Sequence, residues 1–474
     1  MNRLWVILIK KGVYRKMGDV NVIRVVIGLV VAIGLILYMV TRTKIHVFPA
    51  MIIGALAAGL VAGLPSAEVL GAIKSGFGGT LGSIGIIIGF GVMMGAIFEV
   101  SGAAKRMALS FIKLLGKGKE DVAMMITGFI VSIPVFCDSA FVVLSPLSKS
   151  LSRNTGRSLT TISCALGTAL LVTHSLIPPT PGPLAITNYF HLDIGIFMLY
   201  SLIAAIPITI SGLLYAKWIG KRLFKLPSPD DSSVLIDRPY TAEELAVTEE
   251  IDEDDIPGTF IAFAPILIPI LLILLNTVGN MVGFEGTFKS IVATLGHPIV
   301  AVGIGLLIAI YGLAGKMDRK EVVEILDNSI KHAGIIVFVT GAGGALGAVL
   351  KASGAGNAIA QTLVDANIPG IVLPYLMAFL LRIVTGSATV GMLTAGSISA
   401  PILLAMPGIN PYMAGLACCI GSIGITNLHD SYFWVVNRTT GLTDVKEMLW
   451  HWFGAVLSLS VVGAVVLFVM NAIV

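Results

Sequence analysis

The chain has 474 residues, of which 56% are hydrophobic and only 12% are charged. Because soluble domains carry about 25% charged residues, this composition excludes an ordinary soluble enzyme or binding domain and predicts an integral membrane protein. The formal net charge of +4 gives no indication of a nucleic-acid partner.

Residues 1–45 are predicted to hold an N-terminal segment and the first transmembrane helix. The first sixteen residues carry five Lys and Arg and are followed by Met17. Our hypothesis is that the native chain begins at Met17, because these basic residues would otherwise lie on the outer side of the membrane. The segment does not resemble a cleaved signal peptide.

Apolar runs recur along the whole chain at close to the ~20 residues that a spanning helix needs. They predict a multi-pass protein with roughly 12 spanning elements. The clearest runs are Val25–Val40, Val47–Leu64, Ile84–Val100, Phe197–Ile219, Phe260–Val282 and Phe453–Ile473.

The chain divides into two similar halves around a polar segment. Residues 221–257 are acidic and polar, which predicts a cytoplasmic linker. Residues 46–220 form the predicted first repeat and residues 298–474 the second, and residues 258–297 form a connecting transmembrane helix and loop. "GAIFEVSGAAKRMA" starts at Gly95 and "GAVLKASGAGNAIA" starts at Gly347, an offset of 252 residues.

Basic residues indicate how the two halves are oriented. If their clusters face the cytoplasm, Val47–Leu64 runs outward and its counterpart Val300–Leu313 runs inward. This predicts two inverted repeats with both termini outside. Glu99 and Lys351 hold equivalent places in the two halves, and we interpret both as helix-end residues near the membrane interface.

Each half contains two segments that interrupt an apolar run. Proline and glycine break helices, and broken helices at membrane depth are tolerated only beside a cavity or packed protein. Two repeats with matching breaks predict a secondary transporter whose site lies where the breaks meet. The four segments are "SIPVFCDSAF" (Ser132–Phe141), "THSLIPPTPGP" (Thr173–Pro183), "RIVTGSATVGMLTAG" (Arg382–Gly396) and "GITNLHDSYF" (Gly424–Phe433).

Ionisable residues in these breaks are candidates for function, since charged groups are costly inside a membrane. Asp138 is either a proton carrier or the N-cap of the following helix. Arg382 either binds a substrate carboxylate through its forked donors or pairs internally with Asp138 or Asp430. His174 and His429 suit proton coupling; Asp430 either orients His429, caps a helix or holds the proton.

Neutral hydroxyl and amide groups in the same breaks suit a polyhydroxylated substrate. Thr426 also belongs to this set of neutral polar residues. Neither a metal site nor a cofactor is expected, because the four cysteines and the histidines lack metal-ligand spacing. The predicted binding residues are Ser139, Thr173, Thr180, Arg382, Ser387, Thr389, Asn427 and Ser431, and the predicted proton-coupling residues are Asp138, His174, His429 and Asp430.

The segments "FCDSAFVVLSPL", "THSLIPPTPGP", "RIVTGSATV" and "HDSYFW" resemble the gluconate permease family of the ion-transporter superfamily. The resemblance extends from about residue 20 to the end of the chain. It implies an all-α polytopic protein of the bacterial cytoplasmic membrane with two inverted repeats, each with a re-entrant hairpin and a discontinuous helix. It also implies a homodimer, and a transport part that moves against a scaffold as an elevator.

Members of that family carry gluconate, glycerate, fructuronate or D-serine together with protons, and their pattern maps onto Asp138, His174, Arg382, Ser387 and Asp430. The chain departs from the gluconate members at Cys137, Thr180 and the "NLH" of residues 427–429. Because these departures fall at the predicted site, they concern the substrate more than the fold.

The resulting prediction is proton-coupled uptake of a small sugar acid or hydroxy acid such as gluconate or glycerate. The alternatives are a proton-coupled permease for D-serine or another amino acid, and a sodium-coupled carboxylate transporter. An ion channel fits the paired breaks less well. A membrane-embedded enzyme would need a nucleophile–base pair or a metal cluster, which the sequence does not provide.

Overall fold

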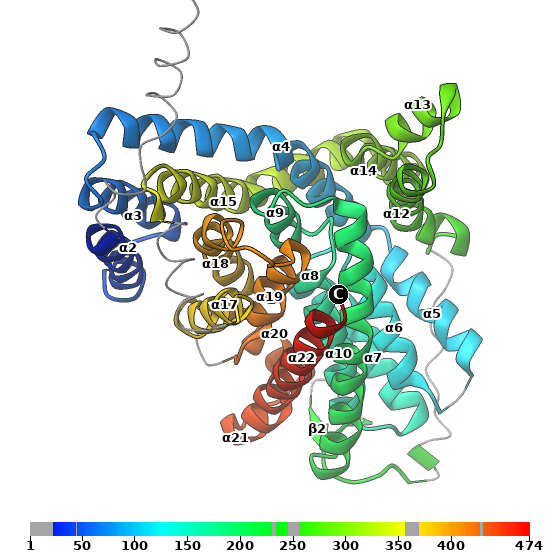
Figure 1. Ribbon diagram of the computed structural model, residues 1–474. Helices are drawn as coiled ribbons and strands as arrows, with labels where there is room; N and C mark the ends of the chain where they lie inside the picture. Colours follow the sequence, from blue (N-terminus) through cyan, green and yellow to red (C-terminus); the bar gives the residue numbers. More distant parts are fainter. Residues whose placement is uncertain are drawn as a thin grey trace, which may run out of the picture.

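The computed structural model describes residues 22–43, 45–116, 118–229, 234–241, 243–244, 256–355, 369–426 and 430–474. Within them the chain is almost entirely helical, and the single sheet is a two-stranded antiparallel hairpin of β1 (Leu226–Pro227) and β2 (Leu235–Ile236). Figure 1 shows the arrangement of the helices.

Most of the helices fall into two groups according to their contacts, and α5 (Ala103–Leu115) contacts members of both. The first, which we call the central group, consists of α6 (Glu120–Val131), α7 (Cys137–Thr155), α8 (Leu159–Leu176), α9 (Pro181–Tyr189), α10 (Ile194–Arg222), α17 (Val372–Thr385), α18 (Ala388–Leu403), α19 (Pro411–Ile423), α20 (Ser431–Thr440) and α22 (Gly454–Ile473). The second, the flanking group, consists of α2 (Val22–Thr41), α3 (Val47–Val61), α4 (Ser66–Val100), α12 (Thr259–Val282), α13 (Gly286–Leu295), α14 (Pro298–Ile308) with the π-turn Ala309–Leu313, and α15 (Arg319–Ala352).

Close packing of two long helices organises the flanking group. α4 and α15 lie side by side (Figure 1) and form the most extensive helix pair of the structure. A Cβ atom at Gly76 of α4 would collide with the backbone carbonyl of Gly344 on α15, so the helices approach this closely because both positions are glycine. α15 also contacts α18, and α4 contacts α9, which joins the two groups.

Long apolar helices confirm a multi-pass membrane protein. Six helices of the described residues are long and apolar enough to span a membrane, or seven if the pair Gly286–Leu295 and Pro298–Leu313, bent by 61°, forms one span. The prediction of roughly 12 spanning elements therefore exceeds the number of long helices. Five further apolar helices have only 10–17 residues, because turns and breaks shorten them.

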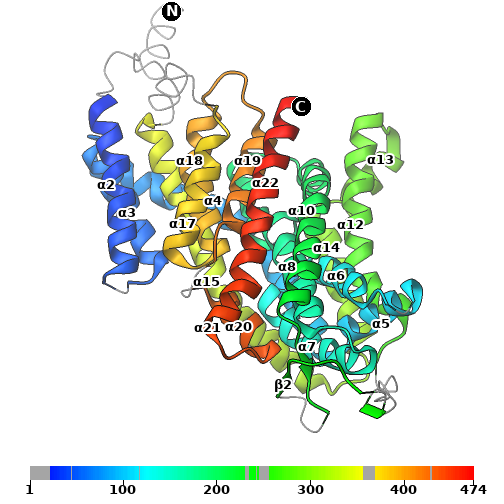
Figure 2. The ribbon, with the colours of Figure 1, turned by 90° about the horizontal axis from the view of Figure 1, so that it is seen from below.

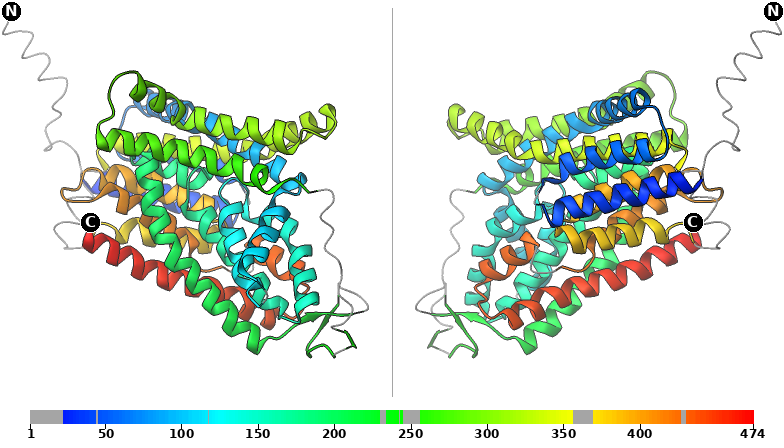
Figure 3. Two further views of the ribbon diagram at one scale, coloured as in Figure 1. Left: turned by 90° about the vertical axis from the view of Figure 1, so that its right-hand side faces the viewer. Right: turned by 90° about the vertical axis from the view of Figure 1, so that its left-hand side faces the viewer.

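The two ends of the described chain lie on the same side of the molecule. Figure 2 shows the start of α2 and the end of α22 on one side and the β1–β2 hairpin on the other, and the side views of Figure 3 agree. α10 ends at Arg222, shortly before β1, so its first residue Ile194 lies roughly 42 Å away, toward the side of the termini.

The described part of the polar linker is folded against the helices. Lys225 forms ion pairs of 2.8 Å with both Asp237 and Glu447. Arg153 of α7 donates a hydrogen bond of 2.9 Å to the Glu244 carbonyl, and its guanidinium lies 4.5 Å from the centre of the Tyr240 ring. Residues 221 and 222, which we assigned to the linker, belong to α10 instead.

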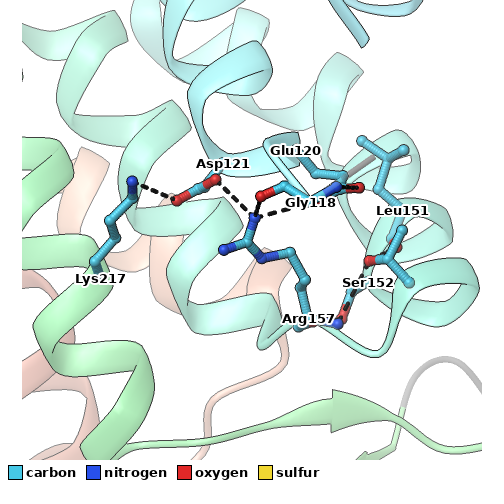
Figure 4. Close-up of polar contacts among 8 residues, drawn as sticks. Gly118, Glu120, Asp121, Leu151, Ser152, Arg157 and Lys217 are labelled. Atoms are coloured by element: carbon cyan, nitrogen blue, oxygen red, sulfur yellow. Dashed lines mark hydrogen bonds and ion pairs between the residues drawn. The ribbon is translucent and has the colours of Figure 1, made fainter. Parts of the chain in front are cut away.

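An ion cluster joins α6, α8 and α10 at their ends nearest the β1–β2 hairpin (Figure 4). Arg157 Nη1, in the turn before α8, lies 3.1 Å from Asp121 Oδ1 and 3.3 Å from Glu120 Oε2 at the start of α6. Lys217 Nζ of α10 lies 3.6 Å from Asp121 Oδ2. The two carboxylates are almost fully buried, so their charges depend on these cations.

We predict that Arg157→Gln destabilises the protein. The substitution removes the main cation from two buried carboxylates, and because Arg157 is about one-third exposed we expect a loss of about 1–3 kcal/mol, below the cost for a fully buried pair. The measurement is Tm of the purified protein in detergent, which should fall by several degrees. Arg238→Gln is the matched control, because its pair with Glu244 is solvent-screened and the substitution should leave Tm nearly unchanged. Equal Tm values for the two variants would contradict this assignment.

Candidate functional site

Four helix starts meet in pairs at the centre of the molecule. Each predicted break separates two helices: α6 from α7, α8 from α9, α17 from α18 and α19 from α20. α20 packs on α7 and α9 packs on α18, so each pair combines one segment from each half of the sequence. A helix start presents free N–H groups and the positive end of the helix dipole, which favours an anion.

Local sequence explains where each helix stops. α8 ends at Leu176 because Pro178 and Pro179 follow, and α9 begins at Pro181, where a missing N–H costs nothing. The stretch Leu159–Tyr189 still qualifies as one membrane span, and only Ile177–Thr180 of "THSLIPPTPGP" interrupt it, because the rest of the segment belongs to α8 and α9. α17 ends at Gly386, whose φ of +68° favours glycine, and Ser387 then caps α18 by accepting a hydrogen bond of 3.3 Å from the Val390 N–H.

Arg382, near the end of α17, and Asp430, at the start of α20, form a buried ion pair. Arg382 Nη2 lies 2.5 Å from Asp430 Oδ2, and the side chains are 3% and 2% exposed. Asp430 Oδ1 accepts a hydrogen bond of 3.0 Å from the Tyr432 N–H and thereby caps α20. Of the alternatives left open for Arg382 the structure contains the internal pair with Asp430, and capping is one of those considered for Asp430.

Asp138 lies inside the first turn of α7. The N-cap of this helix is Phe136, and no side chain makes a capping hydrogen bond, so the N-cap interpretation of Asp138 is wrong. The helix begins at Cys137, two residues earlier than an Asp138 N-cap would require, because the backbone is already in the extended N-cap conformation at Phe136. Asp138 Oδ2 accepts a weak hydrogen bond of 3.7 Å from the Cys137 thiol, and the carboxyl group interacts electrostatically with Arg382 and Asp430.

His174, near the end of α8, contacts the start of α18. Its Nε2 atom lies 3.4 Å from the hydroxyl oxygen of Thr389 at the start of α18. The centre of its ring lies 5.6 Å from that of Phe136. His174, Phe136 and Pro179–Pro181 also line a small cavity.

Several polar atoms near these residues are buried without a hydrogen-bond partner among the described residues. A buried polar atom of this kind is costly unless another group satisfies it. A substrate with a carboxylate and several hydroxyls offers both donors and acceptors of the required kinds. The atoms are Asp138 Oδ1, Thr173 Oγ1, His174 Nδ1, Ser175 Oγ, Arg382 Nε and Thr426 Oγ1.

The other predicted substrate-binding residues differ in burial and in hydrogen bonding. The Thr180 hydroxyl donates a hydrogen bond of 2.5 Å to the Ile177 carbonyl, so its hydrogen is already engaged. Ser139 is half-buried on the first turn of α7. Ser431, the first residue of α20, is exposed, which our sequence interpretation did not anticipate. Asn427 and His429 lie outside the described residues.

Sequence reasoning missed Phe136 and Ser175, although both adjoin residues that it singled out. It also missed His451, which is fully buried at the start of the last helical segment. His451 Nδ1 lies 2.9 Å from Asn437 Oδ1, and its Nε2 atom lies 3.2 Å from the Thr160 carbonyl oxygen. No spacing signal marks this histidine, because it is a single polar residue within "LWHWF".

Comparison with known proteins places this geometry in context. The profile of the GntP family permeases matches residues 24–473. The chain is 44% identical to a permease of Haemophilus influenzae (90% of this chain, 88% of the relative). It is 35% identical to a gluconate permease of Pseudomonas aeruginosa (94% and 97%) and 33% identical to a D-serine transporter of Escherichia coli (95% and 99%). The fold resembles the crystal structure of the YdaH transporter of Alcanivorax borkumensis, with a TM-score of 0.57 and 17% identity over 85% of this chain and 89% of that one.

We predict that Arg382→Gln and Asp430→Asn each destabilise the protein and that their effects are not additive. Each substitution leaves one buried charge unpaired, at a cost of about 3–5 kcal/mol. The double variant should be more stable than the sum of the single effects predicts, by at least about 1 kcal/mol, measured as a double-mutant cycle in detergent.

Asparagine caps helices as well as aspartate does, so Asp430→Asn tests the charge and not the cap. Asp193→Asn is the matched control, because Asp193 caps α10 at an exposed position. Additive effects in the cycle would show that the pair does not act as a unit.

Proposed function

Because the chain belongs to the GntP family of permeases and is therefore a membrane transporter and not an enzyme, we propose that it takes up a small sugar acid or hydroxy acid, such as gluconate or glycerate, together with protons. The observation that carries the proposal is the Arg382–Asp430 pair, which lies buried beside polar atoms that lack a protein partner. A gluconate permease among its relatives supports the substrate class.

The proposed mechanism starts from competition for Arg382. One of its terminal nitrogens is paired with Asp430, and its Nε atom has no hydrogen-bond partner among the described residues. Protonation of Asp430 removes the negative charge from the pair and frees the guanidinium for a substrate carboxylate, which it binds through two parallel hydrogen bonds. Proton and substrate then bind together, which is the requirement for symport.

Asp138 and His174 are the other proposed proton-coupling residues. Both lie near the Arg382–Asp430 pair, and both carry a buried polar atom without a partner among the described residues. Substrate hydroxyls are proposed to bind Thr173, Thr389 and Ser139. His429 and Asn427 stay predictions, His429 for proton coupling and Asn427 for substrate hydroxyls.

Alternating access is proposed to follow the division into two helix groups. The central group would be the moving transport part and the flanking group the scaffold, in an elevator built from two inverted repeats. The crossed packing of α9 on α18 and of α20 on α7 supports this proposal, because each half supplies the same two parts to one site. A homodimer in the bacterial cytoplasmic membrane is proposed by family resemblance.

D-serine is the second candidate substrate. It carries an ammonium group as well as a carboxylate, and within the part of the chain that the structure describes Asp138 Oδ1 has no hydrogen-bond partner with which an ammonium group would compete. A D-serine transporter among the relatives supports this alternative. A sodium-coupled carboxylate transporter is the third.

Uptake into proteoliposomes tests the proposal directly. Labelled gluconate, glycerate and D-serine are compared under a pH gradient, a sodium gradient or no gradient. We expect accumulation of gluconate or glycerate with the pH gradient alone. Accumulation driven by the sodium gradient alone would contradict the proposed roles of the proton-coupling residues. Accumulation of D-serine and of neither acid would show that the substrate is an amino acid and not a sugar acid or hydroxy acid.

We further predict that Asp138→Asn separates coupling from binding. Without an ionisable group at this position the variant should lose accumulation under the pH gradient by at least tenfold, yet still exchange labelled for unlabelled substrate across the membrane. Glu99→Gln is the control, since Glu99 is exposed at the end of α4 and should retain both activities. Full accumulation by Asp138→Asn would remove Asp138 from the coupling residues.

A further inference from the structure

A large groove lies between the two helix groups. It is separate from the buried residues Asp138, His174, Arg382 and Asp430, which we call the central cluster. Its volume of about 910 Å³ lies in the range of ligand-binding sites, about 300–1,000 Å³. α4 and α15 form one wall, and the ends of α9 and α18 form the other. The polar and charged side chains of its lining are Ser75, Thr80, Ser83, Asn188, Tyr189, His191, Lys351 and Ser397.

The charge of this groove favours an anion. Among the described residues, its lining contains Lys351 and His191 and no carboxylate. Lys351 is exposed, and within the described ranges it forms no hydrogen bond or ion pair. An ammonium group surrounded by neutral polar groups attracts anions and raises their local concentration.

Neutral groups on both walls of the groove complete the set that a hydroxylated carboxylate needs. Ser75 and Ser83 use their hydroxyl hydrogens on carbonyls of α4, so their oxygens remain able to accept. Asn188 is half-buried at the end of α9 and supplies an amide that both donates and accepts. His191 follows in the turn after α9, where its φ of 54° is unusual for a residue other than glycine.

Two helices connect this groove with the central cluster. α9 begins at Pro181 beside His174 and ends at Tyr189 in the groove. α18 begins beside Thr389 and reaches the groove at Ser397. Eight helical residues correspond to about 12 Å, so the groove and the cluster are separated by roughly that distance along both helices.

The groove also lies across a contact between the two helix groups. The Tyr189 hydroxyl donates a hydrogen bond of 2.7 Å to the Thr340 carbonyl of α15. The groove is on the side of the α9–α10 turn, which is the side opposite the β1–β2 hairpin. If the hairpin side faces the cytoplasm, as the basic residues predict, the groove opens to the exterior.

We propose that this groove is an outer access site in which a small hydroxylated carboxylate binds before it reaches the central cluster. Lys351 holds the carboxylate, and Asn188 with the serines of α4 contacts the hydroxyls. This inference rests on the proposed function, because it gives the same substrate a first binding site.

The first test separates KM from kcat. Lys351→Gln should raise KM for gluconate uptake three- to tenfold and change kcat less than twofold, and Lys351→Arg should restore KM. Increasing ionic strength should raise KM of the unsubstituted protein but not that of Lys351→Gln. The matched control is Lys289→Gln, because Lys289 is exposed on α13 outside the groove. Equal KM values for Lys351→Gln and Lys289→Gln would overturn the proposal.

The second test does not depend on transport. Ser75→Cys places a thiol in the groove, whereas the four native cysteines are buried. A membrane-impermeant methanethiosulfonate should label this thiol from outside in intact cells at 4 °C. Gluconate should slow the labelling at least threefold, sorbitol should not, and Ser75→Cys/Lys351→Gln should lose the protection.

Protection by sorbitol equal to that by gluconate, or protection that survives Lys351→Gln, would overturn the role of Lys351. Protection by inorganic phosphate as strong as that by gluconate would overturn the assignment to a hydroxylated carboxylate. If no substrate accumulates in proteoliposomes, the proposed function fails, while the labelling result still decides whether the groove binds an anion.

Discussion

The buried pair of Arg382 and Asp430 is the interaction on which the centre of the structure depends. An isolated charge in this environment costs several kcal/mol, so neither residue is tolerated there alone. Pairing requires that the end of α17 meet the start of α20, although 48 residues separate the two in sequence. The pair thus fixes α17 against α20, and α20 in turn packs on α7 of the first half of the sequence.

The broken helices follow from the same constraint. Backbone groups freed by a break must be satisfied inside the protein or face a polar cavity. Ser387 and Asp430 satisfy part of this need by capping α18 and α20. All of α8 is buried, so the break after Leu176 is surrounded by protein and not by lipid. A span interrupted here therefore costs less than the same interruption at a lipid-facing position.

The sequence predicted the breaks well, because proline, glycine and capping residues act locally. The break after α8 lies at its prolines, and the turn at Gly386 falls within the predicted break Arg382–Gly396. Side-chain direction was harder to predict: Asp138 was misassigned as a possible N-cap by a shift of helix start, and Ser431 turned out exposed. The cluster of Glu120, Asp121, Arg157 and Lys217 was missed, because ion pairs between distant residues leave no spacing signal.

Placing one cation in the groove and another in the cluster has a physical consequence for an anion that moves between them. Lys351 is exposed and has no described counter-ion, so its attraction is weakened by solvent and salt. Arg382 is buried, where the same charge acts more strongly, but Asp430 already neutralises it. An anion arriving in the groove therefore gains little by moving inward until Asp430 is protonated. Under the proposed mechanism the proton would then control the second step, binding at Arg382, and not the first, binding at Lys351, which would separate capture of the substrate from its coupling.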